Sequence, residues 1–245
     1  MQSQRIELLD FARGIALIAM TIFHFAFDLQ LLGFKEPGFI EQAHWKYFAR
    51  SIASSFLFLT GVSLYLAHYS GIKWQGWKWR FIKIIAAAIL ITFATYFATP
   101  DQYIFFGILH AIAFASIAGL LFLKLPWFIT FVLAIGVFWL GQYGRTELLD
   151  APYWFWTGLS EARPISSDYV PVFPWMSAPL LGIAFAKLAQ EKGWLSIFAK
   201  PQFEGKGSAA IKFIGRNSLV YNLIHQPIMI ALIIMVSWPL GWISF

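Results

Sequence analysis

The pattern of apolar and polar residues predicts about seven helices that cross a membrane. Apolar stretches recur along the chain, each long enough to cross about 30 Å of bilayer hydrocarbon at about 1.5 Å per residue. Their expected boundaries are 8–33, 47–69, 80–99, 103–123, 126–143, 170–189 and 214–238. We therefore expect an all-α fold, a polytopic helical bundle in the membrane, with residues 1–245 forming a single domain.

A polar stripe runs through the first predicted span. Asp10, Arg13, His24 and Asp28 interrupt the apolar residues of this segment. At about 100° per residue, all four side chains project from one face of a helix. Lipid does not tolerate such groups, so this face must contact protein or a water-filled cavity. The stripe therefore predicts a buried chemical site.

His24 and Asp28 are the predicted catalytic residues. Asp28 lies one turn beyond His24, and a carboxylate at this spacing can orient an imidazole and stabilise its cation, as a general base requires. The structural alternative is a histidine whose hydrogen bonds are satisfied by a neighbouring helix. Arg13 is permanently charged and suits either a phosphate group or a carboxylate such as Asp10 at the membrane surface.

The start of the seventh predicted span offers a second anion-binding feature. Arg216, Asn217 and Ser218 precede its apolar run, where free N–H groups and the positive end of the helix dipole favour an anion. Together with Asp10 and Arg13, these residues are the predicted cofactor-binding set. The alternative is a simple helix cap beside an arginine that orients the protein in the membrane.

The predicted substrate-binding residues lie elsewhere along the chain, and packing or snorkelling is the alternative for several of them. They are Arg50, His110, Asp168, Trp175 and His225. Helix rise places His24 about 24 Å and His110 about 21 Å from the cytoplasmic side, but His225 only about 12 Å. Because these depths differ, we expect no metal site.

Composition narrows the class of protein. The chain is 59% hydrophobic and only 12% charged, which excludes an ordinary soluble domain. It contains no cysteine, which excludes thiolate nucleophiles and cysteine-based metal sites. Asp10 and Arg13 interrupt the N-terminal apolar run, so we expect a retained first span rather than a cleaved signal peptide.

The net charge of +6 reflects lysine and arginine in alternate loops, and we expect no nucleic acid partner. The basic loops are 70–83, the turn at Lys124 and 187–216. The positive-inside rule places them in the cytoplasm, with the N-terminus inside and the C-terminus outside.

Several motifs resemble a known family. Residues 5–16, followed by His24, resemble the opening of transmembrane acyltransferases. Arg13, ten intervening residues and His24 match the Arg-x10-His motif of the acyltransferase-3 family. The rest resembles the catalytic domain of heparan-α-glucosaminide N-acetyltransferase and its bacterial relatives. The segments that carry this second resemblance are 58–61, 106–110, 173–175 with Gly182, 215–219 and 225–227.

The resemblance implies an enzyme of the bacterial cytoplasmic membrane. It would move an acetyl group from cytoplasmic acetyl-CoA to a sugar hydroxyl or amine of an extracytoplasmic glycan or small acceptor. Arg13 and His24 carry over from the Arg-x10-His motif. The expected partners are membrane lipid, acyl-CoA and the sugar acceptor, and a homodimer is left open.

Two other classes of function also fit the sequence. Intramembrane histidine and aspartate suit a small-molecule or proton-coupled transporter, although no inverted repeat is visible. A non-catalytic membrane scaffold is the third reading, but it leaves the cost of the buried polar stripe unexplained. Stabilisation by CoA or acetyl-CoA would favour the acyltransferase over both.

Overall fold

The computed structural model describes residues 6–198 and 204–240; residues 1–5, 199–203 and 241–245, which include the predicted outer C-terminus, lie outside that description. The α-helices are α1 Glu7–Leu31, α2 Ala43–His68, α3 Trp74–Ala98, α4 Ile108–Ala118, α5 Trp127–Tyr143, α6 Val172–Trp175, α7 Ser177–Glu191, α8 Leu195–Phe198, α9 Lys206–Arg216 and α10 Ser218–Ser237. Short 3-10 helices are η1 Pro100–Gln102, η2 Gly119–Phe122, η3 Glu147–Leu149 and η4 Pro152–Thr157. No strand occurs in the described ranges, so the all-α prediction is confirmed.

The helices account for all seven predicted spans. Five segments are long and apolar enough to cross a membrane: Glu7–Leu31, Ala43–His68, Trp74–Ala98, Val172–Glu191 and Ser218–Ser237. Two shorter apolar segments, Ile108–Phe122 and Trp127–Tyr143, supply the fourth and fifth. The protein is therefore a multi-pass helical membrane protein.

Contacts divide the chain into two compact units. The first contains residues up to Ile52 and from Phe198 onward, and the second contains Ala53–Ile197. Helix α2 runs from the first unit into the second. The prediction of a single domain stays a prediction.

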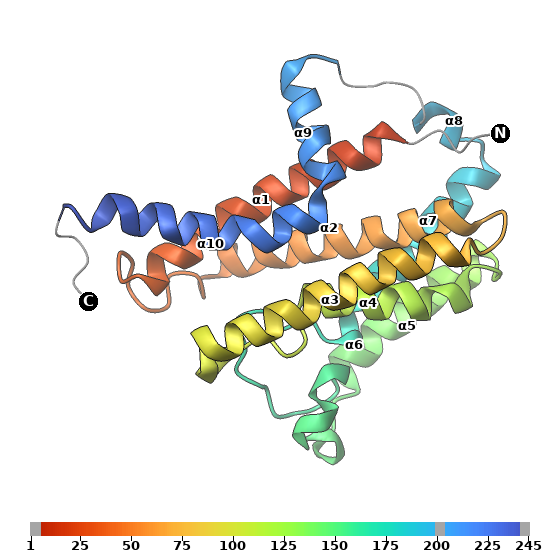
Figure 1. Ribbon diagram of the computed structural model, residues 1–245. Coiled ribbons are helices and arrows are strands. Elements are labelled where there is room, and N and C mark those ends of the chain that lie inside the picture. Colours follow the sequence, from red (N-terminus) through yellow and green to blue (C-terminus); the bar gives the residue numbers. More distant parts are fainter. Residues whose placement is uncertain (1–5, 199–203, 241–245) are drawn as a thin grey trace. The chain divides into compact units, whose positions relative to one another are not determined.

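In the first unit, α9 and α10 both pack on α1 (Figure 1). Two glycines permit the close approach of α9. A Cβ atom on Gly215 would lie 1.8 Å from the carbonyl oxygen of Asp10, and one on Gly14 would lie 2.2 Å from that of Ile211. Any larger side chain at either position would push the two helices apart.

The predicted start of the seventh span at residue 214 is wrong by four residues. Residues 214–216 are the last turn of α9, and α10 begins at Ser218 after a break at Asn217. The reason is that α9 is amphipathic, with basic residues such as Lys212 on one side and apolar residues on the other. An apolar run alone does not separate such a helix from the span that follows it.

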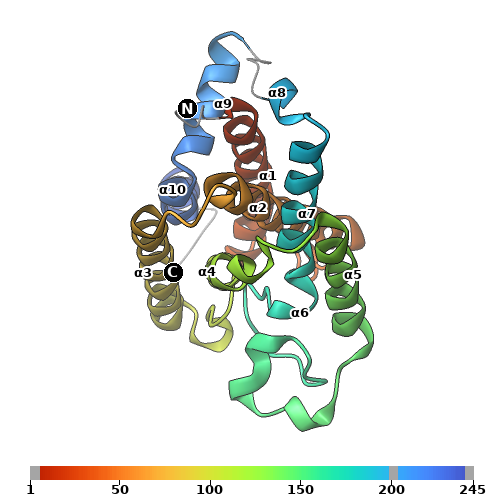
Figure 2. The same ribbon diagram turned by 90° about the vertical axis from the view of Figure 1, so that its right-hand side faces the viewer.

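In the second unit, α7 belongs to Val172–Glu191, which is the most buried of the five long apolar segments. It packs against α5 and α6, while α3 packs against α4 (Figure 2). Gly61 and Gly182 bring α2 and α7 together, since a Cβ on Gly61 would lie 1.9 Å from the carbonyl oxygen of Pro179. The core cluster consists of Leu64, Ala115, Ala134, Val172, Met176, Leu180 and Ile183.

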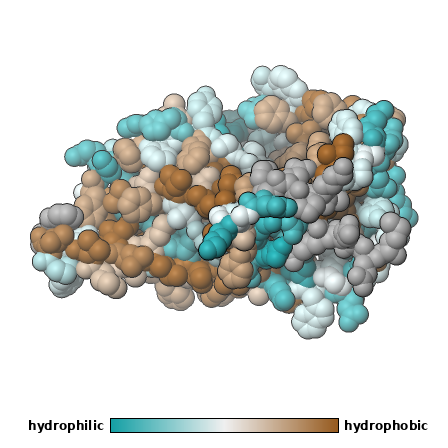
Figure 3. All heavy atoms as spheres, turned by 90° about the horizontal axis from the view of Figure 1, so that it is seen from above, coloured by the Kyte–Doolittle hydropathy of each residue, from teal (hydrophilic) through white to brown (hydrophobic). Residues whose placement is uncertain are grey.

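Large apolar side chains remain exposed on several helices, as expected for surfaces that face lipid. They are concentrated on α3, α5 and α10, and those of α10 are Val220, Ile224, Ile228, Leu232, Met235 and Val236. Figure 3 shows a hydrophobic stretch at the left, where α10 ends. Composition of this kind supports a membrane environment for these faces.

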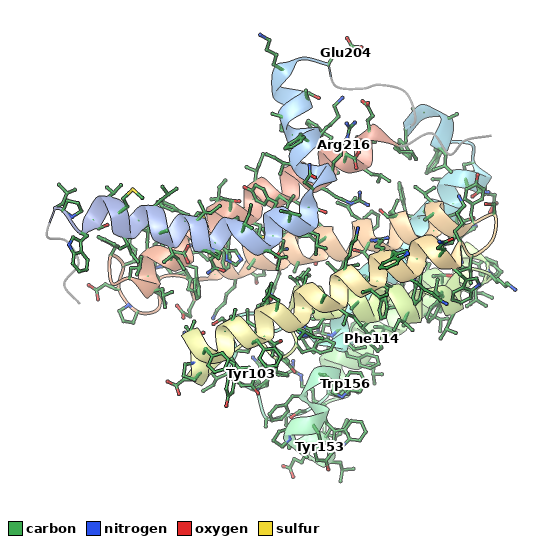
Figure 4. All side chains as sticks on the ribbon, in the orientation of Figure 1. Tyr103, Phe114, Tyr153, Trp156, Glu204 and Arg216 are labelled. Carbon is green, nitrogen blue, oxygen red and sulfur yellow. The ribbon has the colours of Figure 1, made fainter. Side chains whose placement is uncertain are left out.

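The long segment between α5 and α6 is held by its own polar contacts. Asp150 accepts hydrogen bonds from the Ser160 hydroxyl and from the backbone N–H groups of Glu161 and Ala162. These bonds, led by that of Ser160, lower the pKa of Asp150. The Trp156 ring of η4 lies 5.9 Å from that of Phe114 on α4 (Figure 4). The segment is therefore packed against α4 within the second unit.

Candidate active site

A cluster of charged residues joins the start of α1 to the end of α9. Asp10, only 2% exposed, accepts from Arg13 at 3.4 Å and from Arg216 at 3.3 Å. Glu7 pairs with Lys212 at 2.7 Å and with Arg216 at 3.7 Å. Arg216 projects from the end of α9 toward this region (Figure 4). Within the described residues, this cluster consists of three cations, Arg13, Lys212 and Arg216, and two anions, Glu7 and Asp10, which gives it one net positive charge.

The structure thus brings together Asp10, Arg13 and Arg216, as the sequence predicts. It also shows the alternative role of Arg13 as the partner of a carboxylate, because Asp10 pairs with both arginines. Asn217 and Ser218 mark the junction to α10, and the Asn217 amide donates to the Phe213 carbonyl oxygen at 2.9 Å. Binding of a donor molecule at this cluster stays a prediction.

Sequence reasoning missed Glu7 as a member of this cluster. Glu7 lies three residues before Asp10, so helical spacing could have placed it on a neighbouring face. Lys212 reaches Glu7 from α9, an amphipathic helix that packs on α1.

Farther along α1, a second polar cluster is buried against α10. Asp28 is fully buried, and its Oδ1 accepts a hydrogen bond from the Gln226 amide at 3.1 Å. The ring centroids of His24 and His225 are 5.0 Å apart, with the rings at 78°. The Gln226 side chain also interacts with His24. Two residues from α1 and two from α10 therefore form one polar group.

Three nitrogen or oxygen atoms of this group have no partner. His24 Nδ1, Asp28 Oδ2 and His225 Nε2 are buried and make no hydrogen bond within the described residues. Burying a polar atom without a hydrogen bond typically costs about 1–3 kcal/mol. Unpartnered polar atoms gathered at one place are therefore a signal of a site for a polar ligand.

The expected pairing of Asp28 with His24 does not occur in its simple form. The carboxylate bonds to Gln226 instead, and the structure records no direct hydrogen bond between the two side chains in the part of the chain that it describes. Both side chains lie on the expected face of α1, but the amide from α10 is the donor that reaches the carboxylate. Helical spacing cannot reveal a partner that a second helix supplies.

The predicted depth of His225 is wrong. Helix rise alone puts His225 about 12 Å along its helix and His24 about 24 Å along α1. In the structure, however, the two rings pack against each other. The error lies in the reference points. Gly215 contacts Asp10 and Gly14, so α10 begins beside the second turn of α1 rather than beside its first residue.

The second unit holds three of the predicted substrate-binding residues. His110 Nδ1 accepts from the backbone N–H of Gly107 at 3.3 Å, and its Nε2 lies 3.3 Å from the Thr92 hydroxyl. Trp175, in α6, lines a small apolar cavity. Asp168 Oδ2 accepts from the backbone N–H of Ile108 at 2.7 Å and so caps the start of α4.

Burial raises the pKa of Asp168 to about 6, although the bond from Ile108 acts in the opposite direction. Of the remaining predicted residues, Arg50 belongs to the first unit, is exposed, and lies 6.0 Å from the Tyr47 ring centroid. Convergence of Arg50, His110, Asp168, Trp175 and His225 on one substrate stays a prediction.

No group of three or more histidine, cysteine, aspartate or glutamate side chains suited to a metal ion occurs within residues 6–198 and 204–240. The polar groups found here are instead suited to binding charged groups and to moving protons. Imidazole nitrogens supply the proton-accepting capacity, and the arginines and lysine supply positive charge.

A helical membrane protein with a cationic cluster between α1 and α9 and buried imidazoles between α1 and α10 fits the general class of membrane-embedded group-transfer enzymes. The sequence model of the family described as heparan-alpha-glucosaminide N-acetyltransferase, catalytic, matches residues 5–227. The chain belongs to this family of membrane acetyltransferases. No curated protein and no solved structure gives a significant match.

Proposed function

We propose that this protein transfers an acetyl group from cytoplasmic acetyl-CoA to a sugar hydroxyl or amine on the outer side of a bacterial cytoplasmic membrane, with His24 as general base. Membership of the acetyltransferase family supports the reaction class. The observation that carries the proposal is the buried, unpartnered Nδ1 of His24 in an apolar helix. A nitrogen in that state is poised to accept a hydrogen bond and then a proton.

The charged cluster at the start of α1 supports the assignment of the donor end. Arg216 is 42% exposed, so it can turn from its carboxylate partners toward a phosphate group. The net positive charge attracts the CoA phosphates, and Asp10 keeps Arg13 in place beside α9. In this proposal the predicted orientation, with the N-terminus inside and the C-terminus outside, puts the cluster on the cytoplasmic side.

The distance between the two clusters suits the donor molecule. Arg13 and His24 are eleven residues apart on α1, which corresponds to about 16 Å of helix. An extended pantetheine arm can cover a distance of this order. The CoA phosphates can therefore sit at the basic cluster while the thioester reaches the imidazoles.

The chemistry needs little beyond positioning and a base. The thioester is already reactive, so the enzyme has to orient it and remove a proton from the attacking hydroxyl or amine. His24 accepts that proton. Asp28, in contact with Gln226, adds a negative charge near the resulting imidazolium and stabilises it.

The acceptor side is assigned from the second unit. We propose that His110, Asp168 and Trp175 contact the acceptor. A sugar ring binds well to an aromatic face combined with hydrogen-bonding side chains, and this set contains both kinds of group.

Transfer is tested with purified protein, acetyl-CoA and two probe acceptors. Glucosamine offers an amine and hydroxyls, whereas N-acetylglucosamine offers hydroxyls only. Released CoA is read with a thiol reagent, and because the chain has no cysteine, all of the signal comes from CoA. We expect acceptor-dependent release for the wild type. No release with either probe, combined with no thermal stabilisation by acetyl-CoA, would reject the proposal.

The matched variants are His24→Ala and His68→Ala. His68 is also buried, at the end of α2, but its Nδ1 accepts from the backbone N–H of Lys73. Removing a general base typically costs about 10²–10⁴-fold in rate. We expect that loss for His24→Ala and near wild-type rates for His68→Ala, with acetyl-CoA still stabilising both.

A further inference from the structure

The proton position of His225 is fixed by the backbone of its own helix. Its Nδ1 lies 3.1 Å from the carbonyl oxygen of Tyr221 and 3.0 Å from that of Asn222. A carbonyl oxygen can only accept, so Nδ1 carries the proton and donates it. In the neutral ring, Nε2 then holds a lone pair, and this atom is buried without a partner among the described residues.

The ring itself is held firmly in place. It stacks on Tyr221 with 5.7 Å between centroids and an angle of 7° between planes. The Tyr221 hydroxyl lies 2.8 Å from the Thr21 hydroxyl of α1, within hydrogen-bonding distance. The direction of the Nε2 lone pair is therefore set jointly by α1 and α10.

His24 presents a second unpartnered ring nitrogen beside it. His24 Nδ1 is also buried without a hydrogen bond, and the two rings are 5.0 Å apart. When the neutral His24 ring carries its proton on Nε2, Nδ1 also holds a lone pair, and two lone pairs cannot bond to each other because both are acceptors. A single added proton changes this, since one ring becomes a donor and the other remains an acceptor.

We propose that His24 and His225 act as one base, in which His225 is the positioning residue that shares the proton taken up by His24. This inference rests on the proposed acyl transfer. His225 then shares with Asp28 the stabilisation of the imidazolium, which helical spacing assigns to the carboxylate alone. The carboxylate is bonded to Gln226 and acts on the pair through it.

The proton balance of the step is as follows. The acceptor's O–H or N–H bond breaks as its oxygen or nitrogen forms a bond to the acyl carbon. The proton passes to the imidazole pair. The carbon–sulfur bond of the thioester then breaks, and the leaving thiolate takes the proton from the pair, which returns to the neutral state.

The activity test uses His225→Gln, which removes the basic nitrogen but keeps a polar side chain. Kcat with acetyl-CoA and glucosamine should fall about 10²–10⁴-fold, while the KM for acetyl-CoA stays unchanged. His225→Gly should regain part of its rate when imidazole is added to the solution, which a merely structural residue would not allow. His68→Gln is the matched control and should keep its rate.

A loss of folding is separated from a loss of catalysis by His225→Asn. Its side-chain N–H can replace Nδ1 as the donor to the Tyr221 carbonyl, so the helix contact is kept without the basic Nε2. This variant should have the same Tm as the wild type, and its rate of acetyl transfer should be as low as that of His225→Gln. Wild-type turnover in either variant, with the wild-type protein active, would overturn the role of His225 and leave the proposed function standing.

A second measurement does not depend on activity. Nitrogen-15 spectra of histidine-labelled protein report which ring nitrogen carries the proton. We expect His225 to be protonated at Nδ1, and the pair to take up one proton before a second. The other titratable groups at this position are Asp28 on α1 and Tyr221 on α10, so spectra of Asp28→Asn separate its contribution. Independent titration of the two histidines would overturn the pair even if no probe acceptor reacts.

Discussion

Lys187 offers a sharp test of how the second unit is held together. It lies in α7 and is only 7% exposed. Its ammonium group donates to the carbonyl oxygens of Phe122 and Leu125 and, at 3.1 Å, to the Thr130 hydroxyl. The two carbonyls follow α4, and the hydroxyl belongs to α5. One side chain therefore connects three segments, and Lys187→Met would remove these bonds while keeping an apolar stem of similar length.

The expected cost follows from what each acceptor loses. The Phe122 carbonyl keeps a bond from the Leu125 N–H at 3.2 Å, and the Thr130 hydroxyl keeps its own bond to Pro126. The Leu125 carbonyl loses the Lys187 bond. An unsatisfied buried acceptor costs about 1–3 kcal/mol, and each lost hydrogen bond to the charged donor adds to this cost. Removing the buried ammonium charge offsets part of the lost stability. We expect about 2–4 kcal/mol of lost stability in total.

Thermal unfolding in detergent measures this loss. For a chain of this size, about 3 kcal/mol corresponds to a fall in Tm of roughly 6–12 °C. The matched control is Lys124→Met, an exposed lysine on the same side of the unit, which should stay within about 0.5 kcal/mol of the wild type. A Tm for Lys187→Met equal to that of the control would refute the reasoning.

Three further predictions follow from the charged groups. Burial raises the pKa of Asp168 to about 6, so its contribution to stability is full below about pH 4 and is lost as pH rises through 6. Between pH 4 and 8, the Tm of the wild type should therefore fall relative to the Tm of Asp168→Asn. A Tm difference that stays constant over this range would contradict the prediction. Asp10→Asn raises the net charge of the described cluster from one to two, so calorimetry should show that CoA binds several-fold more tightly at low salt. This gain in affinity should shrink at high salt. An unchanged affinity would mean that the cluster is not part of the donor site. Cysteines introduced at the exposed positions Lys78 and Glu147 should react with an impermeant thiol reagent only at Glu147 from outside intact cells, and the reverse pattern would invert the predicted topology.

Much of the fold could be predicted from the sequence because lipid imposes a simple rule. Each spanning segment has to be apolar along its length, whatever its neighbours are. The sequence therefore locates the five long apolar segments that can cross a membrane and the two shorter apolar helices, Ile108–Phe122 and Trp127–Tyr143. It does not separate α9 from α10, because an amphipathic helix joined to a span extends the apolar run without a clear break.

The candidate site also has a part that the sequence predicts and a part that it does not. Helical geometry alone places Asp10, Arg13, His24 and Asp28 on one face of α1, and the structure shows that Asp10 and Asp28 are buried. The partners of these residues come from α9 and α10. Gln226, the partner of Asp28, lies 198 positions away in the chain, and nothing in local spacing points to it.

The properties that depend on one helix at a time follow from the sequence: the all-α fold, the apolar segments and the polar face of α1. Only the tertiary structure decided which side chains pair across helices, because such pairing depends on the register between them. Contact at Gly14 and Gly215 sets that register in the first unit. It puts His225 beside His24 rather than several residues below it, and so replaces the expected carboxylate–histidine pair with two neighbouring imidazoles.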